Sequence, residues 1–325
     1  MSSAALLATE ETESTVIPRL EVGQWLEDGF NWFQDTFSLL IDWADVVFET
    51  SAEGLAGILA APDALILTLI FAVIAWLLRD WKLSLLTIPL MLFIVSVDLW
   101  EESLETLAMV AVAVVVALII AIPLGILAAK SHAVSRAVRP VLDLMQTMPA
   151  LVWLIPTLFM FGLGMPAGIL ATIIFALPPG VRLTELAIRQ VDSEVVEAGH
   201  AFGSTSTQIL FRIQLPLATK TIMAGVNQVI MLALSMAVFA GFVGGGGLGG
   251  VVVGAINRLD LARGLEAGLC VVMLAVFLDR VTASLGSAEG STLARLRRRR
   301  RSSSQHQEQQ NEQEADLEAA ATKTA

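Results

Sequence analysis

Charged residues are scarce in this chain. They make up 16% of its 325 residues, and the mean hydropathy is +0.73, whereas a soluble globular domain has about 25% charged residues. Cysteine is scarcer still, because the single thiol, Cys270, lies in the apolar run GLCVVMLAVFL and cannot close an internal disulfide. These shortages exclude an ordinary soluble domain and a fold held by internal disulfides. We expect Cys270 to be a buried structural residue.

Signatures of catalysis and of metal or nucleotide binding are also missing. The three histidines, His132, His200 and His306, lack the spacing of a metal site, and no G-x-x-x-x-G-K-[ST] loop for ATP occurs. The run GGGGLG (244–249) fits G-x-G-x-x-G formally, but we expect it to end a membrane span rather than to follow a strand. Its glycines then serve turning and tight packing. The sequence predicts no enzyme, no bound cofactor and no metal.

Acidic side chains are absent from the middle of the predicted spans. They cluster at a predicted outer boundary, at positions Asp98, Glu101, Glu102 and Glu105. Toward the predicted inner boundary lie Asp143, Arg182 with Glu185, and Asp279 with Arg280. Carriers coupled to protons or ions tend to place carboxylates or histidines inside their spans. The energy for any transport is therefore expected to come from another protein.

Long apolar runs are what the chain does contain. The run at 106–129 exceeds the roughly 18 apolar residues of a spanning helix. Seven spans are predicted, at 63–78, 83–99, 104–129, 141–163, 166–185, 217–243 and 263–285. The first two are short and could instead form one re-entrant unit. The fold class is an all-α polytopic membrane protein with about seven transmembrane helices.

The distribution of basic residues predicts an orientation. Cytoplasmic loops are rich in Lys and Arg, and four segments meet this rule together: RDWK (79–82), 130–139, 186–216 and RLRRRRR (295–301). The N-terminus then lies outside and the C-terminus in the cytoplasm of a cell carrying this chain in its inner or plasma membrane. Arg258 and Arg263 fall on the outer side, against the rule. The N-terminus shows no signal peptide.

The two ends of the chain differ from its middle. In the N-terminal extension, 1–62, apolar residues recur at helical spacing, at Leu26, Phe30, Phe33, Phe37, Leu40, Ile41, Ala44 and Val47. This amphipathic helix could lie along a membrane or pack on protein, and its acidic polar face favours protein. The tail, 286–325, is basic and then acidic and Gln-rich, and we expect it to be disordered. Its arginine block is expected to be a positive-inside anchor, with lipid or salt sensing as the alternative.

A polar segment of definite pattern, 186–216, separates two predicted spans. Asp192 or Ser193 can cap a first helix, and Gly203 can take the left-handed position after it. One of the residues Ser204, Thr205 and Ser206 can cap a second helix, with Pro216 near the point of membrane re-entry. Exposed apolar anchors are expected at Ala198, Ala201, Phe202, Ile209, Leu210 and Ile213. We call residues 193–216 the knuckle; an apolar surface rimmed by charge is typical of protein docking.

The knuckle resembles the E-A-A-x(3)-G-x(9)-I-x-L-P signature of permease subunits of ABC importers. The matching residues are Glu197, Ala198, Gly203, Ile213, Leu215 and Pro216. Gly199 replaces the usual alanine, which loosens the helix by about 1 kcal/mol. The resemblance implies that this segment is the coupling helix of an ABC type I importer fold. Glu197 would be a polar contact or helix anchor at the groove of an ATPase subunit, or else only a solvated charge, and Gly203 would be the hinge.

A wider resemblance covers residues 60–285. Stretches such as LDLMQTMPALVWLIPTLFMFGLG and INRLDLARGLEAG are similar to the permease of the glycine betaine/proline betaine importers. It implies a permease homodimer in membrane lipid, two ATPase subunits that use ATP and Mg, and an extracytoplasmic substrate-binding protein, with no nucleic acid. Alternating access would move the small solute. Choline, carnitine or an amino acid could be the cargo instead, and a secondary carrier or a membrane scaffold are further alternatives.

The solute path is predicted from polar and aromatic residues within or near the spans. They are Gln146, Thr147, Met148, Trp153, Asn227, Gln228 and Ser235. Aromatic faces attract a quaternary ammonium group. Trp153 is nevertheless expected to face lipid or the core, and Asn227 with Gln228 could bond between helices.

Overall fold

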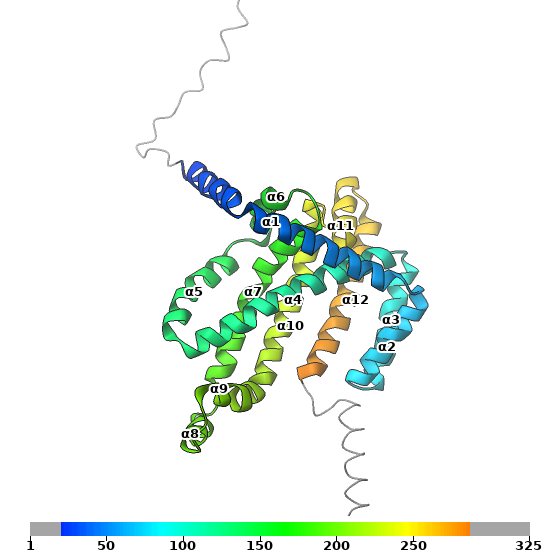
Figure 1. Cartoon of the computed structure of the whole chain (residues 1–325). Helices are drawn as coiled ribbons and strands as arrows, with labels where there is room; N and C mark the ends of the chain where they lie inside the picture. Colours follow the sequence, from blue (N-terminus) through cyan, green and yellow to red (C-terminus); the bar gives the residue numbers. More distant parts are fainter. Residues whose placement is uncertain (1–20, 287–325) are drawn as a thin grey trace, which may run out of the picture. The chain divides into compact units, whose positions relative to one another are not determined.

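The structure, a computed structural model, describes residues 21–286, and these fall into two units, 21–43 and 44–286. The described chain is built from helices and turns (Figure 1). The longer helices are α1 (Val22–Ala60), α2 (Ala64–Leu78), α3 (Trp81–Ser96), α4 (Trp100–Lys130), α5 (His132–Thr147), α7 (Met165–Arg189), α10 (Leu215–Ala240), α11 (Gly247–Arg258) and α12 (Leu261–Gly286). The shorter helices are η1 (Ala150–Trp153), α6 (Leu154–Phe161), α8 (Ser193–Ala201), α9 (Ser206–Ile209), the π-helical turn η2 (Leu210–Gln214) and η3 (Gly241–Val243). The predictions for the tail and for residues 1–20 lie outside the described residues.

Four of the described helical segments are long and apolar enough to cross a membrane. They are Trp100–Lys130, Met165–Arg189, Ser206–Val243 and Leu261–Ser284. Two further spans arise if each bent helix pair, α1 with α2 and α5 with α6, counts as one, and α3 is a shorter apolar helix. The all-α polytopic prediction is confirmed. The number of crossings depends on how the bent and short helices are placed.

The predicted span 141–163 is not one helix. The chain turns by 108° between α5 and the η1–α6 pair. Met148 is extended (φ −72°, ψ 137°) because it precedes Pro149, and a residue before proline avoids the helical region. The amphipathic N-terminal helix, in turn, runs on to Ala60, with non-helical dihedral angles at Phe37.

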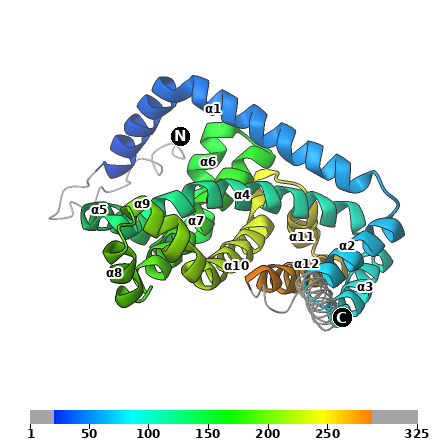
Figure 2. The ribbon, with the colours of Figure 1, turned by 60° about the horizontal axis from the view of Figure 1, so that its bottom comes forward.

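α7 is the central helix of the larger unit. It packs against both α4 and α10, and 72% of its most apolar 18-residue window is buried. α4 and α7 approach closely at Gly125, where a Cβ atom would lie 2.6 Å from Thr184 Cβ. The core cluster between these helices includes Val110, Ala117, Ile173, Val181 and Val229. Beside it α2, α3 and α12 gather together, as Figure 2 shows.

The two ends of α7 carry different structures. α6 lies just before the start of α7, and α8 begins after a three-residue connection from the end of α7. Figure 1 shows α8 and α9 beyond one end of α7 and α10, with α6 and α11 at the opposite end. The polar segment 186–216 is therefore confined to one end of the larger unit.

Candidate functional site

α8 begins and ends where the sequence predicts. Asp192 is the N-cap, and its Oδ1 accepts a hydrogen bond from the Glu194 backbone N–H at 2.9 Å. The helix ends at Phe202, and Gly203 follows with φ +80°, a conformation that glycine adopts without strain. The backbone N–H groups of Gly203 and Ser204 bond back to His200 and Gly199 carbonyls. The turn of the knuckle is thus fixed by local backbone bonds.

The second helix of the knuckle is capped by Thr205. The Gln208 N–H donates to Thr205 Oγ1 at 3.3 Å, and the Thr205 N–H donates to Gln208 Oε1 at 2.8 Å, which is a complete capping box. The helix then widens into the π turn η2, in which the Leu215 N–H bonds to the Leu210 carbonyl. Pro216 lacks an N–H, and the wide turn directly before it relieves the clash of its ring with the preceding turn. α9, η2 and α10 therefore form one continuous candidate span, Ser206–Val243.

Gly199 lies at a close contact inside the knuckle. It is buried, and a Cβ atom there would lie 2.9 Å from Ile213 Cδ1 and 3.3 Å from Ile209 Cγ1. The glycine therefore lets the second helix approach α8, in addition to lowering the helix propensity. This packing role could not be recognised from the departure of one residue from the signature.

Two of the expected exposed anchors are buried, which corrects the prediction. Ile209 is 2% exposed and Leu210 is 3% exposed. Leu210 belongs to an apolar cluster with Ala187 and Ile188 of α7 and Ala218 of α10. These residues seat the knuckle on the end of α7. Ile213 is half-buried, so of the six predicted anchors only Ala198, Ala201 and Phe202 are exposed, the last to 90%. Val195 and Phe211, which were not predicted as anchors, are also exposed.

The first residue of the signature, Glu197, lies on the exposed surface of α8. Within the described residues its carboxylate makes no hydrogen bond or ion pair. Phe202 and Ala198 are exposed on the same short helix and its cap. The knuckle thus presents an unpaired carboxylate on α8 and an exposed aromatic ring at the end of that helix.

A cluster of charges around a buried carboxylate lies next to the knuckle, and sequence reasoning had noted only that one of these charges, Glu185, lies toward an inner boundary. Glu185 Oε1 accepts a hydrogen bond from Ser135 Oγ at 2.8 Å and pairs with Arg189 Nε at 3.0 Å and Arg139 Nη2 at 3.5 Å. Arg189 also donates to the Ala128 carbonyl at the end of α4, at 2.8 Å. We call Ser135, Arg139, Glu185 and Arg189 the Glu185 cluster. It joins α4, α5 and α7.

The predicted solute-path residues fall into separate groups. Gln146 and Thr147 are exposed at the end of α5, with Met148 half-buried at the bend. Trp153 donates from Nε1 to the Met145 carbonyl at 3.2 Å and packs beside a buried cluster that includes Leu154 and Met236. This position matches the core interpretation of Trp153.

The remaining three predicted solute-path residues lie on α10. The Asn227 amide donates to Asp279 Oδ1 of α12 at 2.8 Å, which confirms a bond between helices for Asn227. Gln228 and Ser235 are exposed on α10, and Ser235 Oγ donates to the Met231 carbonyl. The single chain does not bring the seven residues into one cavity.

At the opposite end of the unit the glycine run follows the candidate span that ends at Val243, as predicted, and it also begins helix α11. The N–H groups of Gly247 and Leu248, at the start of α11, donate to Glu105 Oε2 at 2.9 Å and Thr106 Oγ1 at 2.8 Å. A carboxylate at a helix N-terminus is stabilised by the helix dipole. Arg263 bonds to the carbonyls of Val97 and Asp98 after α3. This use of Arg263 explains an arginine at the predicted outer side.

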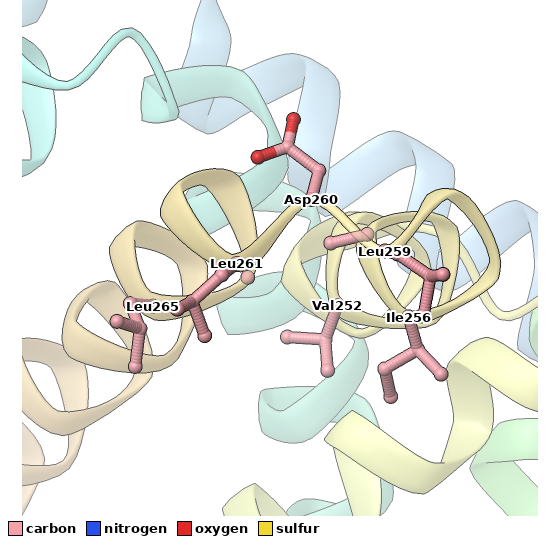
Figure 3. Close-up of a pocket in the computed structure, with 8 residues that line it drawn as sticks. Val252, Ile256, Leu259, Asp260, Leu261 and Leu265 are labelled. Carbon is pink, nitrogen blue, oxygen red and sulfur yellow. The ribbon is translucent and has the colours of Figure 1, made fainter.

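Two cavities lie at the turn between α11 and α12. One, of about 420 Å³, is lined by Val252, Ala255, Ile256, Leu259, Asp260, Leu261, Gly264 and Leu265. Figure 3 shows Asp260 pointing away from the side chains of Val252, Ile256 and Leu265, so the cavity is apolar. The other, of about 390 Å³, is bordered by Glu102, Arg258 and Arg263 among others. Among the described residues, no three acidic, histidine or cysteine side chains are grouped to hold a metal.

Comparison with known proteins identifies the family. Residues 121–288 match the family described as the inner membrane component of binding-protein-dependent transport systems. The chain belongs to this family. The match includes the knuckle, the Glu185 cluster and the whole of α7 and α10.

Curated relatives of this inner membrane component extend the similarity beyond the family match. This chain is 42% identical to the glycine betaine transport system permease protein OpuAB of Bacillus subtilis, over 83% of this chain and 95% of that protein. It is 42% identical to the glycine betaine/carnitine transport permease protein GbuB of Listeria monocytogenes, over 85% and 99% of the two chains. It is 40% identical to the glycine betaine/proline betaine permease protein ProW of Escherichia coli, over 84% and 76%.

Solved structures support the fold. Inward-facing structures of the MetNI methionine ABC transporter align with a TM-score of 0.54 at 22% identity, over 58% of this chain and 95% of that chain. A second crystal form aligns with a TM-score of 0.53 at 24% identity. The chain has the fold of an ABC importer permease, as the sequence resemblance implies.

Proposed function

We propose that this chain is the membrane-spanning permease subunit of an ATP-driven importer for glycine betaine and proline betaine. The observation that carries the proposal is the knuckle, a capped helix–turn–helix that presents Glu197 and Phe202 at one end of α7 and α10. The 40–42% identity to proteins named as glycine betaine permeases supports the choice of solute. ATP and Mg are bound by a separate ATPase subunit.

The mechanism is alternating access driven through the knuckle. ATP binding by the ATPase closes its two halves and moves the attached knuckles, and this opens the path outward to solute brought by an extracytoplasmic binding protein. Hydrolysis then returns the path to the inward-open state. Glu197 contacts the ATPase groove, and the turn at Gly203 keeps the angle between α8 and α9. Ala198 lies on the surface of α8, while Ile213, Leu215 and Pro216 hold the second helix.

A second copy of the chain completes the path. Ala224, Gln228, Met231 and Ser235 recur at helical spacing along α10, and all four are exposed in the single chain. An amide such as that of Gln228 is costly against lipid hydrocarbon and is usually covered by protein or water. A homodimer that pairs these faces of α10 covers it and lets Gln228 and Ser235 line the solute path. Gln146, Thr147 and Met148 stay candidates at the bend after α5.

The knuckle faces the cytoplasm in this proposal. Basic residues gather at its end of the unit, among them Lys130, Arg136, Arg139 and Arg189, whereas Glu101, Glu102 and Glu105 begin α4 at the other end. This asymmetry agrees with the positive-inside rule. The N-terminus then lies outside, and the substrate-binding protein approaches the end that holds α11. Carnitine is a second candidate cargo, because the Listeria relative is named for both solutes.

Two matched substitutions on α8 test the contact with the ATPase. The complex with its ATPase and binding protein is reconstituted, and glycine betaine-stimulated ATP hydrolysis is measured. Glu197→Ala is expected to reduce stimulation about tenfold, the usual effect of losing a polar contact to a charged group at a protein interface. Glu194→Ala removes an exposed acid of the same helix and should leave stimulation within about twofold. Equal behaviour of the two variants would contradict the role of Glu197.

A further inference from the structure

Glu185 is a buried carboxylate that the proposed mechanism has not used. Its side chain is 10% exposed, and it accepts from Ser135 and two arginines contributed by α5 and α7. A carboxylate out of water requires such partners, and removing one side of a buried pair leaves an uncompensated charge. The neighbouring pair between Arg182 and Asp143 joins the same two helices, but its side chains are 41% and 62% exposed. In the Glu185 cluster the carboxylate itself is buried, although Arg139 is 62% exposed, whereas the Asp143 carboxylate is open to water.

α5 has few other attachments to the rest of the unit. Of its residues, only Ser135 and Leu142 are buried. The hydroxyl of Ser135 donates to Glu185, so one of the two buried residues of α5 is held by this carboxylate. A cavity of about 340 Å³ separates the facing surfaces, lined by Arg139, Asp143, Arg182, Glu185, Leu186 and Arg189. At the level of this cavity charged side chains join α5 to α7, whereas Leu142, with Val138 and Met145, packs into the main apolar core.

The cluster lies in the last turns of α7, immediately before the knuckle. α8 begins at Ser193, four residues after Arg189. Ala187 and Ile188 of the same turns hold Leu210 of the knuckle in an apolar cluster. A displacement of the knuckle is therefore transmitted to the end of α7, where Glu185 and Arg189 lie.

The opposite side of the cluster leads to the solute-path candidates. α5 continues from Arg139 to Gln146 and Thr147, and there the chain turns by 108° into η1 and α6. Arg189 also binds the Ala128 carbonyl, so the end of α4 belongs to the same connected set. Figure 1 shows α5 next to α7, with the chain leading from the end of α5 toward α6.

We propose that Glu185 is the positioning residue that makes α5 move with α7 and the knuckle. Motion imposed by the ATPase on the knuckle then reaches the bend at Met148 and Pro149 through the Glu185 cluster. The proposal rests on the proposed function in that it requires the knuckle to be moved by an ATPase. It assigns to Glu185 no contact with solute or nucleotide.

The coupling ratio, the solute imported per ATP hydrolysed, tests this role in liposomes that hold the full complex. Glu185→Gln is expected to assemble and hydrolyse ATP at the unstimulated rate, while the coupling ratio falls about fivefold or more. Asp143→Asn removes the exposed pair between the same helices and should keep the ratio within about twofold. Glu185→Asp, which retains the charge, should recover part of the ratio. An unchanged ratio in Glu185→Gln, or an equal loss in Asp143→Asn, would overturn the proposal.

Two further measurements decide the case if Glu185→Gln does not assemble or if betaine is the wrong solute. Ser135→Ala leaves both arginines in place and should lower the ratio about two- to fivefold; no change would count against the proposal. Spin labels at the exposed positions Val141 of α5 and Val195 of α8, in a Cys270→Ala background, report the distance between these helices without any solute. Their distance should stay constant on ATP binding, and a change in the otherwise unaltered chain would refute coupled motion. If betaine does not stimulate ATP hydrolysis but the distance between the two labels stays constant on ATP binding, only the proposed function is contradicted.

Discussion

Gly199 and Gly203 stand four positions apart in the knuckle and meet different physical requirements. Gly203 has φ +80°, with open space around the position of a Cβ atom. Gly199 has ordinary helical geometry but faces Ile213 and Ile209 at close range. The first glycine is required by its backbone conformation and the second by its neighbours. Substitutions at the two positions should therefore fail for different reasons.

Replacing Gly203 tests the backbone requirement. Gly203→Pro forces φ to about −65°, removes an N–H that bonds to His200, and should reduce betaine-stimulated ATP hydrolysis about tenfold or more through loss of the turn. Gly203→Asn is the matched control, because asparagine tolerates the left-handed region, and it should retain most of the activity. Hydrolysis by the reconstituted complex measures both. Equal loss in the two variants would show that the absence of a side chain, and not φ, is what matters.

Local signals in the sequence predicted the caps of the knuckle but not its packing. Asp192 and Gly203 act through bonds within a few residues, so residue type and position suffice to place them. Ile209 and Leu210 lie four and three residues before Ile213, and this helical spacing indicates an apolar face without showing which element covers it. In the structure Leu210 packs against α7 and Ile209 faces Gly199 of α8, and the prediction that they are exposed was wrong. The Glu185 cluster was not predicted for the same reason, since Arg139 and Ser135 lie 46 and 50 residues from Glu185 in the sequence.

At the scale of the elements, some prolines lie inside helices and one follows a helix break, and the sequence around them does not distinguish the two cases. Pro123 lies inside α4, and Pro178 and Pro179 lie inside α7. Pro149, by contrast, follows the break after α5. The apolar run 141–163 is long enough for a span, so length and hydropathy indicated one helix. At Met148 the proline effect acts together with the bond from Trp153 to the Met145 carbonyl, which spans the turn.

The cap of α11 gives a prediction at this scale. Glu105→Ala removes the acceptor for the Gly247 N–H and should destabilise the chain by about 1–2 kcal/mol, because the helix start loses both a hydrogen bond and a favourable charge. Glu101→Ala removes an exposed acid from the first turn of the same helix, α4, and should cost less than about 0.5 kcal/mol. Thermal unfolding of the purified chain in detergent compares them. A midpoint for Glu105→Ala that matches that of Glu101→Ala would contradict the capping role.

At the scale of the whole molecule, the two ends of the larger unit differ in chemistry as transport requires. One end carries the knuckle and the Glu185 cluster, and the other carries α11, its acidic cap and the polar cavity near Arg258. Apolar runs and basic loops predicted this polarity, because both follow from the membrane as solvent. The face of α10 that a second copy would cover could not be predicted from them, since one chain does not contain its partner.

ATP-dependent uptake of glycine betaine is the most direct measurement of the central claim. Liposomes holding this chain with its ATPase and enclosed ATP receive the binding protein and labelled glycine betaine outside. The account predicts uptake that requires ATP, the ATPase and the binding protein, and that falls about tenfold on Glu197→Ala. Uptake without the ATPase would instead identify a secondary carrier. ATP-dependent uptake of another solute with none of glycine betaine would keep the permease and refute the proposed cargo.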